Sequence, residues 1–124
     1  MSELIQLEKR GHIAVLTIAN PPANTWTADS LAALKATVEE LNDDRNIFAL
    51  VVTGQGEKFF SAGADLKTFA DGDRARANDM AQRFGEAFAA LTAFRGVSIA
   101  AVNGYAMGGG LECAMACDIR IAEE

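Results

Sequence analysis

The sequence has few of the residues on which metal or disulfide chemistry depends. It contains one histidine, two cysteines and two prolines in 124 residues. A zinc site that used His12 with Cys113 and Cys117 would need ligands from elsewhere, so we expect no bound metal. The two cysteines are four apart in a predicted helix, where a disulfide between them is strained. We therefore expect two buried, reduced thiols in a cytoplasmic protein.

Long apolar runs and an excess of positive charge are also missing. No apolar run approaches the ~20 residues of a membrane-spanning helix, and no secretory signal opens the chain. Acidic residues outnumber basic ones by 17 to 11, and the pI is near 4.7. This balance excludes nucleic acid and anionic membranes as expected partners. Half of the residues are hydrophobic, which is typical of one soluble folded domain.

The hydrophobic pattern predicts alternating strands and helices. Residues 4–9 and 12–19 are predicted to form a hairpin, and residues 118–122 a final strand. The apolar segments 47–53 and 97–102 predict strands that are buried on both faces. Helices are predicted up to residue 42 after an N-cap at Thr27, from residue 74 to a stop at Arg95 and Gly96, and over 109–116. Residues 59–64 are predicted to be irregular, 103–110 to form a loop, and Asp65 to cap a short helix. The order predicts an α/β layer fold.

A glycine-rich segment follows the second apolar strand and opens the last helix. Four of the 11 glycines fall between Gly104 and Gly110. Glycine lets a ligand approach the backbone closely, and the first N–H groups of a helix attract negative charge. The segment lacks Gly-x-Gly-x-x-Gly and a closing Lys-Ser or Lys-Thr pair, so it is not a dinucleotide or phosphate loop of the usual kind. It predicts a site for a small anion or a developing negative charge.

Glu112 lies about one turn into that helix and has two interpretations. It is either a first-turn residue that stabilises the helix dipole or reaches back to the cap, or an acid/base group beside an anion site. The second segment of interest is residues 59–67, where Gly63 and its small neighbours bring the backbone close to a ligand. Ser61 is not in a Gly-x-Ser-x-Gly elbow, and Asp65 is most simply a helix cap.

Two segments together resemble the crotonase family, the enoyl-CoA hydratases and isomerases. They are Phe-Ser-Ala-Gly-Ala-Asp-Leu-Lys at 60–67 and Ala-Ala-Val-Asn-Gly-Tyr-Ala-Met-Gly-Gly-Gly-Leu-Glu-Cys-Ala-Met at 100–115, followed by Cys117-Asp118. Either motif alone is weak, but both in this order are specific. The resemblance covers essentially the whole chain. It implies a crotonase-like spiral of repeated ββα units, incomplete at the C-terminus, with residues 1–124 as the N-terminal part of a single domain.

The resemblance also implies a ligand and the residues that hold it. The ligand is an acyl-CoA thioester, in which coenzyme A is part of the substrate, and no separate cofactor is expected. The backbone N–H groups of Ala64 and Gly109 correspond to the family's oxyanion hole. The family's CoA-binding loop corresponds, together with these two residues, to Ala62, Asp65, Leu66 and Lys67.

Glu112 corresponds to the first of the two catalytic glutamates of the hydratases, and we expect the second beyond Glu124. The resemblance implies hydration of a 2-enoyl-CoA by a protein that assembles as a homotrimer or hexamer. Three other reactions use the same oxyanion hole: double-bond isomerisation, decarboxylation and thioester hydrolysis. A truncated, non-catalytic chain that binds CoA is the remaining alternative.

Overall fold

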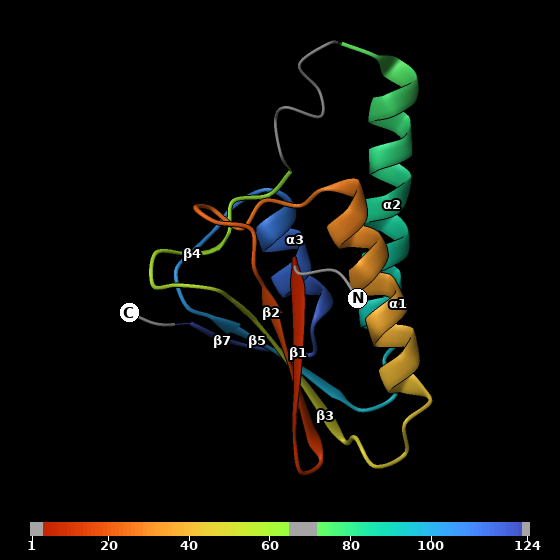
Figure 1. The fold of residues 1–124 in the computed structure, drawn as a ribbon, viewed down its shortest axis with the longest axis vertical. Coiled ribbons are helices and arrows are strands. Elements are labelled where there is room, and N and C mark those ends of the chain that lie inside the picture. Colours follow the sequence, from red (N-terminus) through yellow and green to blue (C-terminus); the bar gives the residue numbers. More distant parts are fainter. Residues whose placement is uncertain (1–3, 65–71, 123–124) are drawn as a thin grey trace.

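The computed structural model describes residues 4–64 and 72–122. The elements in these ranges are β1 (Ile5–Arg10), β2 (Ile13–Ile18), α1 (Ala28–Asn42), β3 (Ala49–Gly54), β4 (Phe59–Ser61), α2 (Arg74–Thr92), β5 (Val97–Val102), β6 (Tyr105–Ala106), α3 (Gly109–Ala116) and β7 (Ile119–Ala122). A large sheet has the strand order β1-β2-β3-β5-β7, and β4 pairs with β6 in a small second sheet (Figure 1). The predicted α/β arrangement is confirmed.

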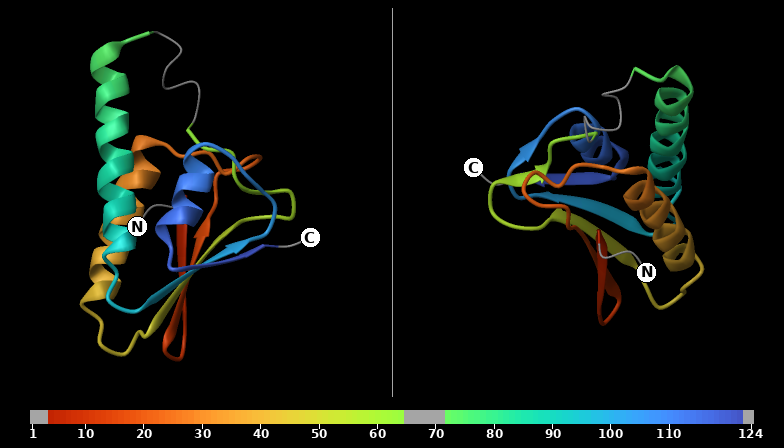
Figure 2. Two further views of the ribbon diagram at one scale, coloured as in Figure 1. Left: turned by 180° about the vertical axis from the view of Figure 1, so that it is seen from behind. Right: turned by 45° about the horizontal axis from the view of Figure 1, so that its top comes forward.

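The large sheet begins with the predicted hairpin and continues in parallel. β1 pairs antiparallel with β2 in a register that places Ile5 opposite Ile18. From β2 onward the pairs β2–β3, β3–β5 and β5–β7 are all parallel, and each parallel pair requires a crossover connection. α1 and α2 run side by side (Figure 2), and α3 packs between α2, β5 and the small sheet.

The core lies on one face of the sheet. Alternate residues of the central strands are fully buried against the helices, since side chains along a strand point to opposite faces. The largest fully buried side chains include Leu16, Ile18, Trp26, Leu31, Leu34, Leu41, Leu50, Phe60, Met80 and Leu91. Burial of a Leu, Ile, Phe or Met side chain of this kind stabilises the fold by roughly 1.5 to 3 kcal/mol relative to leaving it exposed.

The other face of the sheet is less buried than the sequence predicts. Val15, Val51 and Ile99 lie in one row across β2, β3 and β5, and all three are only partly buried. On β7, Ile121 keeps 62% of its surface exposed. The prediction that 47–53 and 97–102 are buried on both faces is therefore wrong for this face, because no described segment packs on it.

The predicted start of α1 is confirmed. The side chain of Thr27 accepts a hydrogen bond from the amide of Ser30, and the Ser30 hydroxyl accepts one from the amide of Thr27. This reciprocal cap satisfies two donors that the helix leaves free at its start. Asn42 ends the helix, and its carbonyl accepts from the Arg95 side chain at 2.7 Å.

The end of α2 differs from the prediction. The helix begins after Asp73, whose carboxylate accepts from the amides of Ala75 and Arg76, but it ends at Thr92. Gly96 is therefore not the helix stop. A Cβ at Gly96 would collide with the carbonyl of Phe48, so the glycine allows the chain entering β5 to pass close to β3. In the sequence, a glycine that permits close approach looks the same as one that ends a helix.

Two segments predicted as irregular contain short strands. Residues 59–61 form β4, and residues 105–106 of the predicted glycine-rich loop form β6. Both strands are too short to show hydrophobic periodicity in the sequence. The short helix expected after Asp65 lies outside the described residues. In the described part of the chain, no helix combines the length and apolarity needed to cross a membrane.

Candidate active site

The two motif segments lie side by side. β4 and β6 are parallel, with Phe59 opposite Tyr105, so the chain leaves both strands in the same direction. The amide of Met107 donates to the carbonyl of Ser61 at 3.0 Å and continues the pairing one step further. Residues 62–64 and 107–109 therefore emerge together at one end of the small sheet.

Gly63 brings these two segments into direct contact. Its φ of +98° lies in a backbone region that residues with a side chain rarely adopt. A Cβ built on it would lie 2.9 Å from the carbonyl oxygen of Met107 and 3.1 Å from the nitrogen of Gly109. Gly110 makes a second close approach, because a Cβ there would collide with the carbonyl of Ser61. The backbone that carries the Ala64 amide thus passes next to the Gly109 amide only because these glycines lack side chains.

The amide of Gly109 lies at the start of α3, which is confirmed at the predicted bounds of 109–116. The next amide, that of Gly110, donates to Met107, and the amide of Glu112 donates to Gly108. Within residues 4–64 and 72–122, neither the Gly109 N–H nor the Ala64 N–H has a protein acceptor. Two backbone donors of this kind, one at a helix N-terminus, favour an oxygen that carries negative charge.

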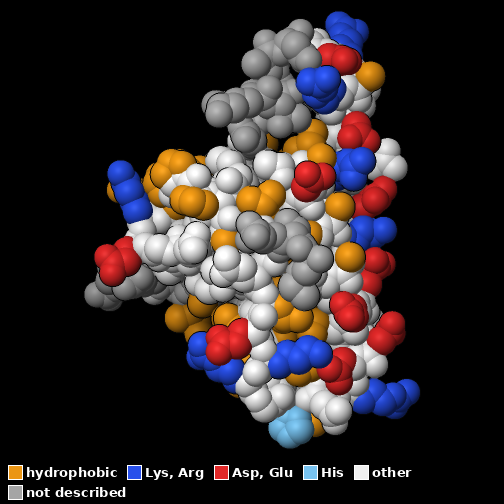
Figure 3. All heavy atoms as spheres, in the orientation of Figure 1, with side chains coloured by type: hydrophobic (Ala, Val, Ile, Leu, Met, Phe, Trp, Pro, Cys, Tyr) orange, Lys and Arg blue, Asp and Glu red, His pale blue; other side chains and the backbone are white. Residues whose placement is uncertain are grey.

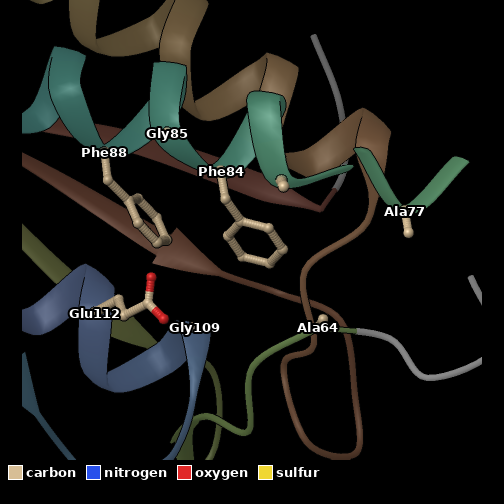
Figure 4. A pocket seen from close by; sticks show the side chains of 8 residues that line it. Ala64, Ala77, Phe84, Gly85, Phe88, Gly109 and Glu112 are labelled. Atoms are coloured by element: carbon tan, nitrogen blue, oxygen red, sulfur yellow. The ribbon is translucent and has the colours of Figure 1, made fainter. Parts of the chain in front are cut away.

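A cavity of about 620 Å³ opens over these donors (Figure 4). Ala64, Gly109 and Glu112 form one side of it. The opposite side is a stripe of α2, in which small residues alternate with aromatic rings. The α2 residues that line the cavity are Ala77, Ala81, Phe84, Gly85 and Phe88. The space is lined mainly by apolar groups with few polar ones, which is typical of a small-molecule site.

Glu112 is the acidic side chain among the described residues that line this cavity. Its carboxylate points from α3 toward the rings of Phe84 and Phe88 (Figure 4). The N-cap of α3 is Gly108, and no side-chain hydrogen bond caps the helix there. Glu112 follows the cap by four residues. The structure therefore contradicts the interpretation of Glu112 as a residue that reaches back to the cap. Its position in the first turn still stabilises the helix dipole.

The other predicted CoA-loop residues divide into two groups. Ala62 is half-buried, and its amide donates to the carbonyl of Ala23 at 2.9 Å, which fixes the start of the loop. Asp65, Leu66 and Lys67 lie outside the described residues. Ser61 is fully buried, and its hydroxyl donates to the carbonyl of Asn24 at 2.8 Å, so its role is structural.

The cysteines are confirmed as free, buried thiols. Burial raises the pKa of Cys113, and it raises the pKa of Cys117 to about 11. A thiol is nucleophilic only as the thiolate, so neither side chain is prepared for covalent chemistry near neutral pH. Asp118 exchanges hydrogen bonds with Ser98 of β5, so its side chain holds the start of β7 against β5.

The sequence predicts that His12 begins a strand, but in the structure it lies in the exposed turn between β1 and β2. Its Nδ1 is 2.7 Å from the carbonyl oxygen of Asn46, and its ring stacks on Phe48. It does not line the cavity. Charged side chains of both signs are spread along the outer edge formed by α1 and α2 (Figure 3), where they are solvated.

Sequence reasoning missed the small residues of the cavity wall. Ala77, Ala81 and Gly85 recur every four residues, a spacing that places them on one helix face. The absence of bulk at all three was the available signal, because a helix face of small residues leaves space instead of filling it.

The chain belongs to the enoyl-CoA hydratase/isomerase family, whose sequence model matches residues 8–124. The short-chain-enoyl-CoA hydratase of Clostridium acetobutylicum is 40% identical over 117 residues, which are 94% of this chain and 45% of that protein.

Solved structures agree with this assignment. The structure of DspI from Pseudomonas aeruginosa is 70% identical, with a TM-score of 0.97 over 98% of this chain and 50% of that one. An enoyl-CoA hydratase from Bacillus anthracis is 30% identical, with a TM-score of 0.93 over 97% of this chain and 47% of that one. The fold is therefore that of the crotonase family. The chain spans about half the length of each of these relatives.

Proposed function

We propose that this chain supplies the oxyanion hole and one acid/base group of an enzyme that hydrates a 2-enoyl-CoA thioester. The observation that carries the proposal is the convergence of three groups on one cavity: the Ala64 and Gly109 backbones and the Glu112 carboxylate. Family membership supports it, and so does the name of the hydratase relative at 40% identity. The substrate carries coenzyme A as part of the thioester, so the reaction needs no separate cofactor.

The proposed reaction adds water across the double bond. The oxygen of water bonds to the β-carbon while one of its O–H bonds breaks and a carboxylate takes the proton, and the electron pair of the double bond moves toward the thioester carbonyl. The resulting enolate-like oxygen accepts hydrogen bonds from the amides of Ala64 and Gly109, and the α-carbon then takes a proton. Loss of one oxyanion donor typically lowers the rate ~10²- to 10³-fold.

Glu112 lies on the cavity side where the water must be held. In this proposal its carboxylate orients the attacking water and takes part in proton transfer, an effect worth ~10²- to 10⁴-fold. A second carboxylate belongs to the proposal, and none of the other described residues that line the cavity supplies it. The CoA moiety is proposed to lie along Ala62, Ala64 and Gly109 and the loop that contains Asp65, Leu66 and Lys67.

Double-bond isomerisation is the second candidate reaction. Moving a double bond along an acyl chain requires one group that removes a proton and returns it to another carbon. One carboxylate beside an oxyanion hole meets this requirement, and Glu112 is the acidic side chain that the described cavity lining offers. The family description includes both activities.

Incubation of the natural full chain with crotonyl-CoA tests the proposal, with the Glu112→Ala variant in parallel. We expect 3-hydroxybutyryl-CoA as the product of the wild type and a loss of ~10²-fold or more in the variant. A shifted double bond without added water identifies an isomerase. Unchanged turnover in the variant removes Glu112 from the mechanism, and binding of acetyl-CoA without any turnover identifies a CoA-binding chain.

We further propose a cytoplasmic homotrimer or hexamer. The partly exposed row Val15, Val51 and Ile99 and the exposed Ile121 support an assembled state, because apolar patches of this kind are commonly covered. Light scattering of the natural chain measures its mass directly, and a monomer at micromolar concentration contradicts this part.

A further inference from the structure

Trp26 contacts both of the segments that carry the proposed oxyanion donors. It is the single tryptophan of the sequence, lies between β2 and α1, and is fully buried. The next residue, Thr27, is the N-cap of α1, so the chain at Trp26 is fixed relative to this helix. Trp26 also forms an isolated parallel bridge with Ala64.

The backbone of Trp26 orients the first donor. Its N–H donates to the carbonyl of Gly63 at 2.7 Å. That carbonyl and the N–H of Ala64 belong to the same peptide group, in which they point in opposite directions. Because the carbonyl is held toward Trp26, the Ala64 N–H is turned away from the Trp26 backbone and is left without a described protein acceptor.

The ring of Trp26 lies close to the residue that carries the second donor. Its Cδ1 is 3.5 Å from the point where a Cβ on Gly109 would be, and the Phe84 ring is 2.7 Å from the same point. Trp26 packs edge-on against Phe88 with ring centroids 5.8 Å apart, and Phe88 packs in the same way against Phe84 at 5.6 Å. The rings of Trp26 and Phe84 thus both lie against the first residue of α3, and Phe88 packs against both rings.

The contact made by the ring is one of packing alone. Its Nε1 is buried and has no hydrogen-bond partner among the described residues. A buried N–H without a partner is destabilising, so an explanation for its presence is required. The size of the indole gives one, because the ring has to reach both Gly109 and Phe88 from the start of α1.

We propose that Trp26 is a positioning residue of the oxyanion hole, which orients the Ala64 amide through its own backbone and the Gly109 amide through its ring. This rests on the proposed function, since the two amides matter to catalysis only if a thioester oxygen is bound there. The two actions separate on substitution. A change of the side chain removes the support under Gly109 and leaves the backbone bond to Gly63 in place.

The test compares Trp26→Phe and Trp26→Leu with Leu34→Ala in the natural full chain. Leu34 is equally buried, lies on α1 and does not line the cavity. We expect kcat for crotonyl-CoA to fall ~10- to 100-fold in the Trp26 variants, part of the effect of losing one donor, with KM within about threefold. Leu34→Ala lowers the melting temperature and leaves kcat within about threefold. Equal kcat in all variants overturns the proposal.

A second readout is independent of activity. In ¹H–¹⁵N spectra of Trp26→Phe, the Gly109 amide shift moves, and the Ala64 amide shift moves less because its hydrogen-bonded peptide is retained. If the wild type hydrates no enoyl-CoA, the proposed function fails, but these two shifts still decide the role of Trp26. Should both Trp26 variants fail to fold, the assigned indole N–H resonance of Trp26 in the wild type decides: it shifts on saturation with acetyl-CoA, and an unmoved resonance overturns the proposal.

Discussion

Replacement of Gly63 by alanine is the sharpest perturbation of the candidate site. The added Cβ meets two different obstacles. The backbone φ of +98° is unfavourable for any residue with a side chain, and the new methyl lies 2.9 Å from the Met107 oxygen and 3.1 Å from the Gly109 nitrogen. The first effect is local strain, whereas the second forces apart the two segments that carry the proposed donors.

A matched substitution separates the two effects. Gly56 has a φ of +87°, and a Cβ there has no neighbour within 4 Å. Gly56→Ala therefore introduces the strain alone, about 1 to 2 kcal/mol. Gly63→Ala adds the steric overlap, and typical overpacking costs bring its total to about 2 to 5 kcal/mol. Backbone atoms on both sides prevent relief by rotation of a side chain.

The assay is crotonyl-CoA turnover together with denaturant unfolding of both variants. Movement of the Gly109 amide away from the thioester oxygen is expected to lower kcat ~10²- to 10³-fold in Gly63→Ala, relative to Gly56→Ala. Acetyl-CoA affinity is expected to fall as well, because Ala62, Ala64 and Gly109 are proposed CoA contacts, so kcat is compared at saturating crotonyl-CoA. If Gly63→Ala and Gly56→Ala have kcat values within about threefold of each other, the close approach at Gly63 has no catalytic role and the reasoning is wrong.

Three further predictions concern single contacts. Glu112→Gln is expected to lower kcat ~10²-fold or more and to leave acetyl-CoA affinity unchanged by calorimetry, whereas the exposed Glu40→Gln changes neither. Asn24→Ala removes one bond from the Asn20 amide and two to the carbonyls of residues 55 and 59, so chemical denaturation should show a loss of about 2 to 4 kcal/mol; a loss below about 0.5 kcal/mol contradicts it. Because burial raises the pKa of Cys117 to about 11, the unfolded chain releases that thiol proton first. Stability should therefore fall as pH rises from about 9 toward 11, and Cys117→Ala should flatten this slope, while an equal slope in both proteins refutes the assignment.

The regular elements of the fold follow from local signals in the sequence. Thr27 with a helical repeat of leucines predicts α1, and alternating or continuous apolar runs predict the strands, because these patterns reflect which side chains are buried. The sequence predicts a helix stop at Arg95 and Gly96, but α2 ends at Thr92, because a glycine can either end a helix or allow a close approach. Only the position of the Phe48 carbonyl distinguishes the two.

The candidate site was predictable in its residues and not in its geometry. The glycines and Glu112 were visible as a motif, and the family resemblance supplied Ala64 and Gly109. The parallel pairing of β4 with β6 could not be read from strands of two and three residues, yet it brings these amides together. The role of Trp26 was likewise hidden, because it depends on contacts with segments far along the chain.

The most direct test of the account is a crystal structure of the natural chain with a bound acyl-CoA thioester. The account predicts that the thioester oxygen lies ~2.7 to 3.1 Å from the backbone nitrogens of both Ala64 and Gly109. It also predicts that the Glu112 carboxylate faces the acyl group in the same cavity. A thioester oxygen bound away from either nitrogen, while the acyl group occupies the cavity beside α2, would contradict it.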